Sequence, residues 1–396
     1  PGRQNTTSSN APSLIVPIPT FALDHINSSI TNTSGLEIAI GEVIVVKSAV
    51  SMIEGTSTII IVVTLSTLGS AVQMEHLGST LELGASQTCG APAGTISPVH
   101  NSSNLTFDLG TCVNTGDNNS ATNIESIRIL STIRLVDISE NWQGAQPAVR
   151  SELFYQRDSG IASLDGSVTY TIVAPILTVS ITNATTRDVD AGDFVTYLIV
   201  VSHAGGSTAA GYDLNVTASV PAELAIQPSD TGLVGASNLT IEFTLDELTL
   251  GSTMERTFVV VVLDTVKPAQ TLIAEVDLSY DSNPEAFGGA PGRQNTTRSE
   301  APSLIVPEPT FVFEHINSST VNTSDLEIVI GELVVVKSAV SMIEGTSTII
   351  IVVTLPTLGS AVQMEHLGST LELGASQTCW APAGTISPVH NSSNLT

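Results

Sequence analysis

The residues with the most readily assigned chemistry are asparagines followed two positions later by Ser or Thr, the acceptor pattern for N-linked glycans. Of the 20 asparagines, 14 have this pattern, well above what the Ser and Thr content predicts. They are Asn5, Asn27, Asn32, Asn101, Asn104, Asn118, Asn183, Asn215, Asn238, Asn295, Asn317, Asn322, Asn391 and Asn394. Asn215 shares the outward parity of Asp213, and Asn238 that of Thr240, so a sugar there would point into water. The alternative is that polar asparagines simply occupy turns. The density predicts N-glycans and a eukaryotic secretory route, with an archaeal surface protein as the second candidate.

The three cysteines predict one disulfide. We expect Cys89 to pair with Cys112, which would restrict the unfolded chain by about 3 kcal/mol. Cys379 is the counterpart of Cys89 in an internal repeat, and the counterpart of Cys112 would fall past the last residue. The alternative is a pair of buried free thiols, but dense glycan acceptors indicate an oxidising compartment.

Three aspartates, Asp188, Asp190 and Asp193, occupy one predicted turn. Their oxygens are the kind of ligand that calcium prefers, and such a site would suit a domain junction. A complete calcium loop would also need a closing Glu, which the segment lacks. We therefore favour a plain acidic turn and expect no metal and no cofactor.

The remaining candidates for catalysis have weak patterns. The seven histidines are His25, His76, His100, His203, His315, His366 and His390, and none falls in a metal-binding or nucleophile motif. Lys47 and Lys337 lie in apolar strands and would suit either an isopeptide crosslink or, as we favour, side chains that extend to a strand edge. The sequence does not show whether two carboxylates lie close enough in space for glycoside hydrolysis. We predict that the protein is no enzyme.

Charge and hydropathy exclude several partners. Asp and Glu outnumber Lys and Arg by 38 to 12, which gives a net charge of -26 and argues against nucleic acid or anionic membrane surfaces. The longest apolar runs, 59–63 and 258–263, are far shorter than a membrane-spanning helix. The chain opens on a polar, Pro-rich stretch without a signal-peptide pattern, so we interpret it as an internal piece of a longer protein.

The elements that must position these residues are β-strands. Apolar and polar residues alternate between turns rich in Gly, Pro, Asn and Asp, as in Leu214, Val216 and Ala218. The runs 43–46, 59–63 and 258–263 are apolar on both faces, as in central strands or in contacts between domains or subunits. We predict an all-β chain of tandem Ig-like β-sandwich domains joined by Pro/Ser/Thr-rich linkers.

A long internal repeat divides the chain. Residues 1–106 superpose on residues 291–396 with 14 differences in 106 positions, so the repeat period is 290 residues. We predict a linker at 1–20, a first domain at 21–174, a second domain at 175–282, a repeated linker at 283–310 and the front part of a repeated first domain at 311–396.

Each linker contains a short apolar segment between prolines. These segments are Leu14, Ile15 and Val16, and in the second copy Leu304, Ile305 and Val306. Flanking prolines favour an extended backbone. Such a segment is either a plain spacer, which we favour, or an assembly strand that adds to the edge of a neighbouring sheet.

Part of the second domain resembles a known module. The stretch LTVSITNATTRDVDAGDFVTYLIVVSHAGGSTAAGYDLNVTASVPAEL at 177–224 is similar to the Ig-like repeat module of unknown function found in tandem in microbial surface proteins. The matching motifs are Gly192-Asp193, Val195-Thr196-Tyr197, Tyr212-Asp213 and the turn Pro221–Leu224. Segments 36–65, 105–114 and 274–285 resemble strands of companion modules, whereas Thr217–Pro221 departs from the usual pattern. The resemblance implies stalk or fibre segments without catalysis.

Two functions remain open. The first is a structural subunit of an extracellular, glycosylated filament, a surface fibril or a flagellar hair, whose partner is another copy of itself. Its organisation is similar to that of mastigoneme-type repeat proteins, by analogy alone. The second is the stalk of an adhesin or receptor whose ligand-binding part lies elsewhere. Near-identity between the copies favours a spacer, since recognition surfaces would differ from copy to copy.

Overall fold

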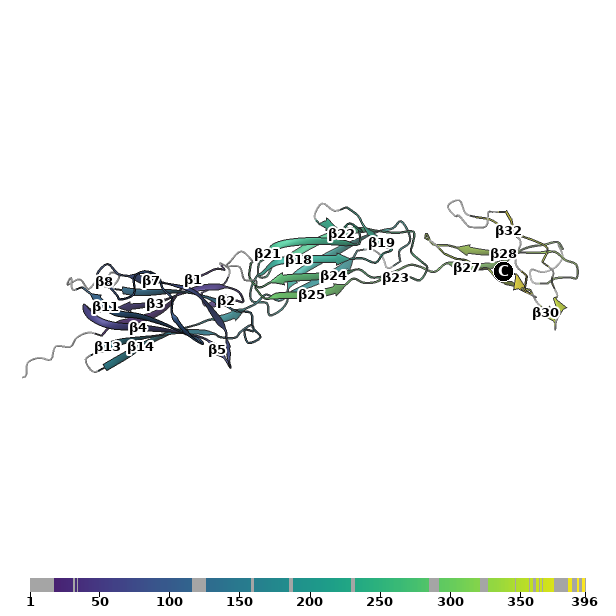
Figure 1. Ribbon diagram of the computed structural model, residues 1–396. Helices are drawn as coiled ribbons and strands as arrows, with labels where there is room; N and C mark the ends of the chain where they lie inside the picture. Colours follow the sequence, from purple (N-terminus) through teal and green to yellow (C-terminus); the bar gives the residue numbers. More distant parts are fainter. Residues whose placement is uncertain are drawn as a thin grey trace, which may run out of the picture.

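The computed structural model describes residues 18–30, 33, 35–115, 126–157, 160–184, 188–228, 232–284, 292–320, 327–345, 347–355 and short stretches between 357 and 395. These residues contain strands and no helix, so the predicted all-β class is confirmed. Three units follow one another in a row (Figure 1), which we call domain A (20–173), domain B (177–306) and domain A′ (from 310). The first two are two-sheet sandwiches of Ig-like type.

Domain A pairs a sheet of order β1-β3-β12-β7-β9 with one of order β10-β11-β4-β13-β14, to which β8 adds beside β11. The bounds of the first sheet are β1 Thr20–Ser28, β3 Val43–Ser51, β12 Ser126–Leu135, β7 Met74–Leu83 and β9 Gly94–Thr95. Those of the second are β10 Val99–Asn101, β11 Asn104–Asn114, β4 Gly55–Leu65, β13 Ala148–Arg157, β14 Gly160–Thr169 and β8 Gln87–Thr88. Two small pairs complete the domain: β2 Glu37–Ala39 with β15 Thr171–Val173, and β5 Thr67–Leu68 with β6 Ala71–Val72.

The strands that are apolar on both faces are central strands. β3 lies between β1 and β12, and β4 between β11 and β13. Ile59, Ile61 and Val63 of β4 are buried in the core, while Ile60 and Val62 on the opposite face are half-buried. Alternation therefore persists within an apolar run, because successive side chains of a strand point to opposite faces.

Domain B has the same two-layer plan, with sheets β16-β17-β22-β19 and β20-β21-β18-β24-β25 and the pair β23-β26. The bounds are β16 Leu177–Asn183, β17 Phe194–His203, β18 Gly211–Ser219, β19 Leu224–Ile226, β20 Leu233–Val234, β21 Thr240–Leu248, β22 Thr253–Val262, β23 Thr271–Leu272, β24 Glu275–Asp281, β25 Gln294–Glu300 and β26 Leu304–Ile305. Tyr197 and Phe258 stack in its core with ring centroids 5.2 Å apart.

The interpretation of 283–310 as a linker is corrected by the last two strands of domain B. β25 pairs antiparallel with β24 over seven residues, and β26 pairs with β23. Leu304 and Val306 are fully buried in the core of domain B. The polar composition of 294–300 is that of an edge strand, because backbone hydrogen bonds form a sheet without apolar side chains. The domain therefore extends to residue 306.

Domain A′ repeats only the beginning of domain A. Its strands are β27 Thr310–Ser318, β28 Val334–Ser341, β29 Val353–Thr354, β30 Thr357–Leu358, β31 Ala361–Val362, β32 Ser369–Leu371, β33 Gly384–Ile386, β34 His390–Asn391 and β35 Asn394–Leu395. Ile330 is exposed whereas its counterpart Ile40 is buried, and Ile350 is exposed whereas its counterpart Ile60 is half-buried. The shared part of the repeat, residues 1–106 and 291–396, does not include β12 to β15 of domain A.

Candidate functional site

The junction between domains A and B has a small apolar core. Ile30, Ala39 and Val173 of domain A and Ala210 and Tyr212 of domain B form one buried cluster. The parallel pair of β15 and β2 places the exit of domain A beside this cluster. Burial of apolar surface between the domains stabilises a fixed arrangement at roughly 25 cal/mol per Å².

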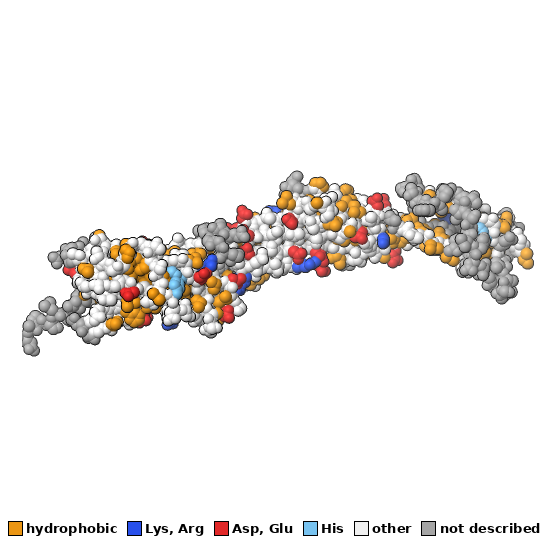
Figure 2. Space-filling model, viewed as in Figure 1, with side chains coloured by type: hydrophobic (Ala, Val, Ile, Leu, Met, Phe, Trp, Pro, Cys, Tyr) orange, Lys and Arg blue, Asp and Glu red, His pale blue; other side chains and the backbone are white. Residues whose placement is uncertain are grey.

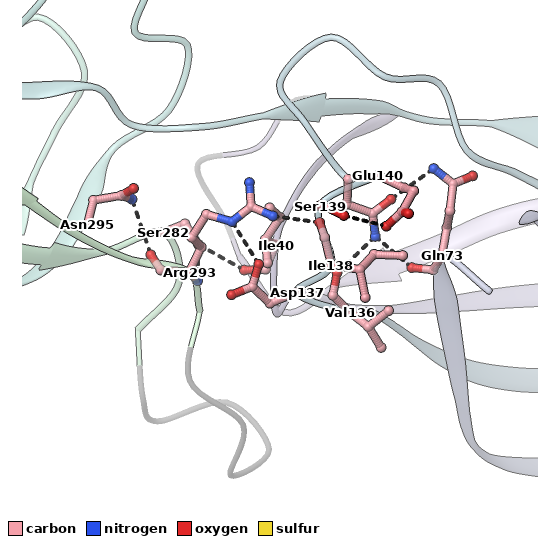
Figure 3. Close-up of polar contacts among 11 residues, drawn as sticks. Ile40, Gln73, Val136, Asp137, Ile138, Ser139, Glu140, Ser282, Arg293 and Asn295 are labelled. Atoms are coloured by element: carbon pink, nitrogen blue, oxygen red, sulfur yellow. Dashed lines mark hydrogen bonds and ion pairs between the residues drawn. The ribbon is translucent and has the colours of Figure 1, made fainter. Parts of the chain in front are cut away.

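A set of polar contacts also spans this junction (Figure 3). Arg293, just before β25, donates from Nε to Asp137 Oδ1 at 2.7 Å and from an Nη2 hydrogen to the Ile138 carbonyl at 2.7 Å. The Ser282 hydroxyl donates to the Ile40 carbonyl at 3.2 Å and accepts from the Arg293 backbone N–H at 2.7 Å. A guanidinium that binds two acceptors at once holds orientation as well as distance.

A third set of contacts joins the loop after β17 to domain A. The Gln143 amide donates to the Gly206 carbonyl at 2.6 Å and to the Thr208 hydroxyl at 2.9 Å. The Thr208 hydroxyl accepts from the Ala174 N–H, and the Ser207 hydroxyl accepts from the Ile176 N–H. Residues 174–176, between the two domains, are thus hydrogen-bonded.

A buried carboxyl group lies next to this junction. Glu42 is 0% exposed, and its two oxygens accept from the Ala39 N–H at 2.7 Å and from the Thr33 hydroxyl at 2.9 Å. Burial raises the pKa of Glu42 to about 7, although the hydrogen bonds from Ala39 and Thr33 lower it in part. Sequence reasoning missed both Glu42 and Arg293. The sequence offered one signal for each residue. Glu42 is an acid beside an apolar run, and Arg293 has a counterpart, Arg3, in the first copy of the repeat.

The junction between domains B and A′ is built from a turn of A′. Ile343 packs on the core of domain B. Burial, followed by the charges of Asp193 and Glu344, raises the pKa of Asp190, whose carboxylate accepts a backbone hydrogen bond from Glu344. Gly345 lies against Val266, so close that a Cβ there would come within 3.1 Å of the Val266 carbonyl.

The three candidate calcium ligands lie at this second junction and have turn contacts. Asp193 accepts from the Asp190 N–H at 3.1 Å, and Asp188 forms an isolated bridge to Ile305. In the part of the chain that the structure describes, no three His, Cys, Asp or Glu side chains gather closely enough to hold a metal ion.

The predicted disulfide is present in domain A. Cys89 and Cys112 are joined with an Sγ–Sγ distance of 2.10 Å, 23 positions apart in the sequence. Cys112 is fully buried on β11, and Cys89 packs against the same core. The bond ties the segment after β8 to the second sheet. Cys379 lies outside the described residues.

The described glycan acceptors lie at the surface. Asn27, Asn101, Asn215, Asn238 and Asn317 are exposed, and Asn104, Asn183 and Asn295 are half-buried. Asn391 and Asn394 lie in β34 and β35, and Asn5, Asn32, Asn118 and Asn322 fall outside the described residues, as do Leu14, Ile15 and Val16. Figure 2 shows acidic side chains on the visible face of domains A and B, with few Lys or Arg.

One histidine contact resembles a catalytic pair. His76 Nε2 lies 2.9 Å from the Ser79 hydroxyl, which in turn lies 3.0 Å from the Ser131 hydroxyl. Burial and the nearby His100 lower the pKa of His76. None of the described contacts of His76 is to a carboxylate that would orient it as a base. Lys47 forms a surface ion pair with Asp24 at 3.0 Å.

One hollow on domain B offers little for chemistry. A hollow of about 360 Å³ lies between residues 225–228 and 232–234, and its lining residues include no acid, base or nucleophile. None of the described residues forms a helix of the length and hydropathy that crossing a bilayer requires.

Comparison with known proteins leaves the function open. No family model and no curated protein matches the chain, so the resemblance to Ig-like surface modules depends on its motifs alone. Among solved structures, BcpA, the major pilin subunit of Bacillus cereus, aligns with 8% identity and a TM-score of 0.28 over 70% of this chain and 65% of that chain. The collagen adhesin of S. aureus aligns with 11% identity and a TM-score of 0.21 over 71% and 93%. AvmM, which catalyses macrocyclization in alchivemycin A biosynthesis, aligns with 10% identity and a TM-score of 0.21 over 34% and 91%. The chain thus spans less than two thirds of the pilin subunit, and likeness this low carries no argument about function.

Proposed function

We propose that this chain is a structural subunit of an extracellular, N-glycosylated filament, such as a surface fibril or a flagellar hair, built from 290-residue tandem repeats. One observation carries the proposal: both kinds of junction in the repeat are made by specific contacts. Arg293 binds domain A while its own strand belongs to domain B, and Gly345 of domain A′ lies against Val266 of domain B. Domains joined by such contacts keep a constant spacing and orientation along the chain.

The glycan acceptors support an extracellular setting for this filament. Asn215 and Asn238 are exposed on domain B, so a sugar at either position would extend into solvent without disturbing the core. A coat of sugars and a net charge of -26 would keep long chains of such domains from sticking side to side.

The stalk of a cell-surface adhesin or receptor is the second candidate. Junctions of this kind suit a rigid spacer as well as a filament, and the near-identity of the two copies fits both. The two differ in self-association, since a stalk works as a single chain and a filament needs copies of itself.

Electron microscopy of the purified protein, with and without glycosidase, tests the proposal. We expect regular filaments with a constant axial repeat, and peptides that carry N-glycans at the exposed acceptors by mass spectrometry. Isolated, flexible strings of domains would reject the filament and favour the stalk. Unmodified asparagines in protein from a glycosylating host would reject the glycan coat.

A further inference from the structure

Domain B is completed by a segment that comes from the beginning of a repeat. Residues 292–306 run along its edge as β25 and β26, bonded on both sides. The Ala301 N–H donates to the Ala274 carbonyl at 2.8 Å and the Val306 N–H to the Gln270 carbonyl at 2.9 Å. On the other side, the Val189 N–H donates to the Ile305 carbonyl at 3.0 Å. The segment is therefore an integral part of the sandwich.

The same segment occurs at the start of the chain, in residues 2–16. Of its 15 positions, 13 are identical to residues 292–306, and the two that differ are Ser8 for Arg298 and Asn10 for Glu300. Both Arg298 and Glu300 are exposed. Every buried position is retained: Gly292, Ala301, Leu304 and Val306 correspond to Gly2, Ala11, Leu14 and Val16. Gly292 leaves no space for a side chain, because a Cβ would lie 2.6 Å from the Asn283 nitrogen.

We propose that residues 2–16 bind the domain B of a second copy of this chain, in the place that residues 292–306 occupy within one chain. The partner surface is the edge formed by β24 and β23. Leu14 and Val16 would fill the positions of Leu304 and Val306, and Arg3 would reach Asp137 of the second copy as Arg293 reaches Asp137 within the chain. Strand addition to a sheet edge needs only a matching backbone and pockets for alternate side chains.

One of the two differences favours the segment of the same chain. Arg298 forms ion pairs with Glu275 and Asp277 on β24, which Ser8 cannot form. Covalent connection also gives residues 292–306 a high effective concentration at their own domain. The segment of the same chain is therefore favoured within one molecule, and residues 2–16 compete with it for the domain B of a second copy.

Exchange of this kind joins copies head to tail. The donor is at the start of one chain and the acceptor is its domain B, so the two surfaces differ and the contact does not close on itself. In copy one, Gly55 has nothing within 4 Å, whereas its counterpart Gly345 lies against Val266 of domain B. In a head-to-tail pair, Gly55 would take the place that Gly345 has against Val266. The inference deepens the proposed filament and rests on it only for its biological setting.

Full-length variants in solution test the proposal. Leu304→Asp with Val306→Asp displaces the segment of the same chain, and we expect the mass from light scattering to rise with concentration above the 41.1 kDa of one chain. The matched variant that adds Leu14→Asp and Val16→Asp is expected to show no such rise. A displaced variant that stays monomeric, or equal association of both variants, would overturn the proposal.

A synthetic peptide of residues 1–17 provides a second test, which covers the case in which domain B of the displaced variant does not fold. An excess of peptide is expected to raise the melting temperature of domain B and to return the mass to that of one chain. A peptide with Leu14→Asp and Val16→Asp is the control, and equal effects of both peptides would contradict the proposal. A peptide with Ser8→Arg is expected to bind several-fold more tightly, because it restores the ion pairs of Arg298. Because these assays do not depend on filaments, their failure is distinct from an absence of filaments in the microscope.

Discussion

Arg293 Nε lies 2.7 Å from Asp137 Oδ1, a contact between residues 156 positions apart that connects domain B to domain A. The same guanidinium also binds the Ile138 carbonyl. One side chain therefore orients two sandwiches, and its position at the beginning of β25 links that orientation to the strand that completes domain B.

Replacement of Arg293 by Ala is expected to loosen this junction. The pair is partly exposed, so the loss of stability is about 1 kcal/mol or less, and the main effect is a wider distribution of angles between the domains. Distances between spin labels on domains A and B, measured by electron paramagnetic resonance, report that distribution. Arg293→Lys keeps the charge but cannot bind two acceptors as a planar guanidinium does, so the width of its angle distribution should be intermediate. Arg256→Ala is the control, since its guanidinium donates to the Glu255 backbone carbonyl within domain B. An equal change in both Ala variants would contradict the assignment.

Stability of domain A should fall as the pH rises. The pKa of Glu42 is raised from 4.5 to about 7 in the folded protein, mainly because the group is buried. Its neutral form is therefore favoured by folding, and this stability is complete below pH 4.5 and lost as the pH rises through about 7. The shift corresponds to about 3 kcal/mol. Chemical denaturation at pH 5 and pH 8 measures the loss.

The variant Glu42→Gln isolates this group. Its side chain stays neutral, so domain A should be more stable than in the unaltered protein at pH 8 and should change less between the two pH values. An unchanged pH dependence in Glu42→Gln would show that other groups cause it.

Reduction of the disulfide is expected to destabilise domain A alone. Opening the loop between Cys89 and Cys112, 23 positions apart, restores freedom to the unfolded chain worth about 3 kcal/mol. Calorimetry of the oxidised and reduced protein should show a lower melting temperature for domain A and an unchanged one for domain B. A double Ala variant of the two cysteines should match the reduced protein, and an equal loss in both domains would disprove a local role.

Gly345 and Gly55 form a matched pair for the junction between B and A′. Both have a positive φ, of 125° and 129°, so Ala strains either backbone to a similar degree. Only Gly345 is in contact with domain B, through Val266. Gly345→Ala should widen the distribution of distances between spin labels on domains B and A′, and Gly55→Ala should not. An equal change in the two variants would mean that the contact does not hold the junction.

Local pattern was enough to predict much of the fold. In β18, Leu214, Val216 and Ala218 are buried and Asn215 is exposed, as alternation indicates. A strand exposes every second residue whatever sheet it joins, so this information is carried by neighbours in sequence. The error in the segment 292–306 has the complementary cause. Residues 294–300 are polar and include three Ser or Thr, and this strand exists because β24 offers a free edge.

The sequence by itself determined the all-β class, the 290-residue repeat, the acceptor asparagines and the cysteine pair, because each is a property of spacing along the chain. Only the tertiary structure decided that residues 292–306 belong to domain B, that Glu42 is buried and that Arg293 meets Asp137. Those facts depend on which surfaces meet after the chain has folded, and the residues that meet are separated by many positions that leave no periodic signal.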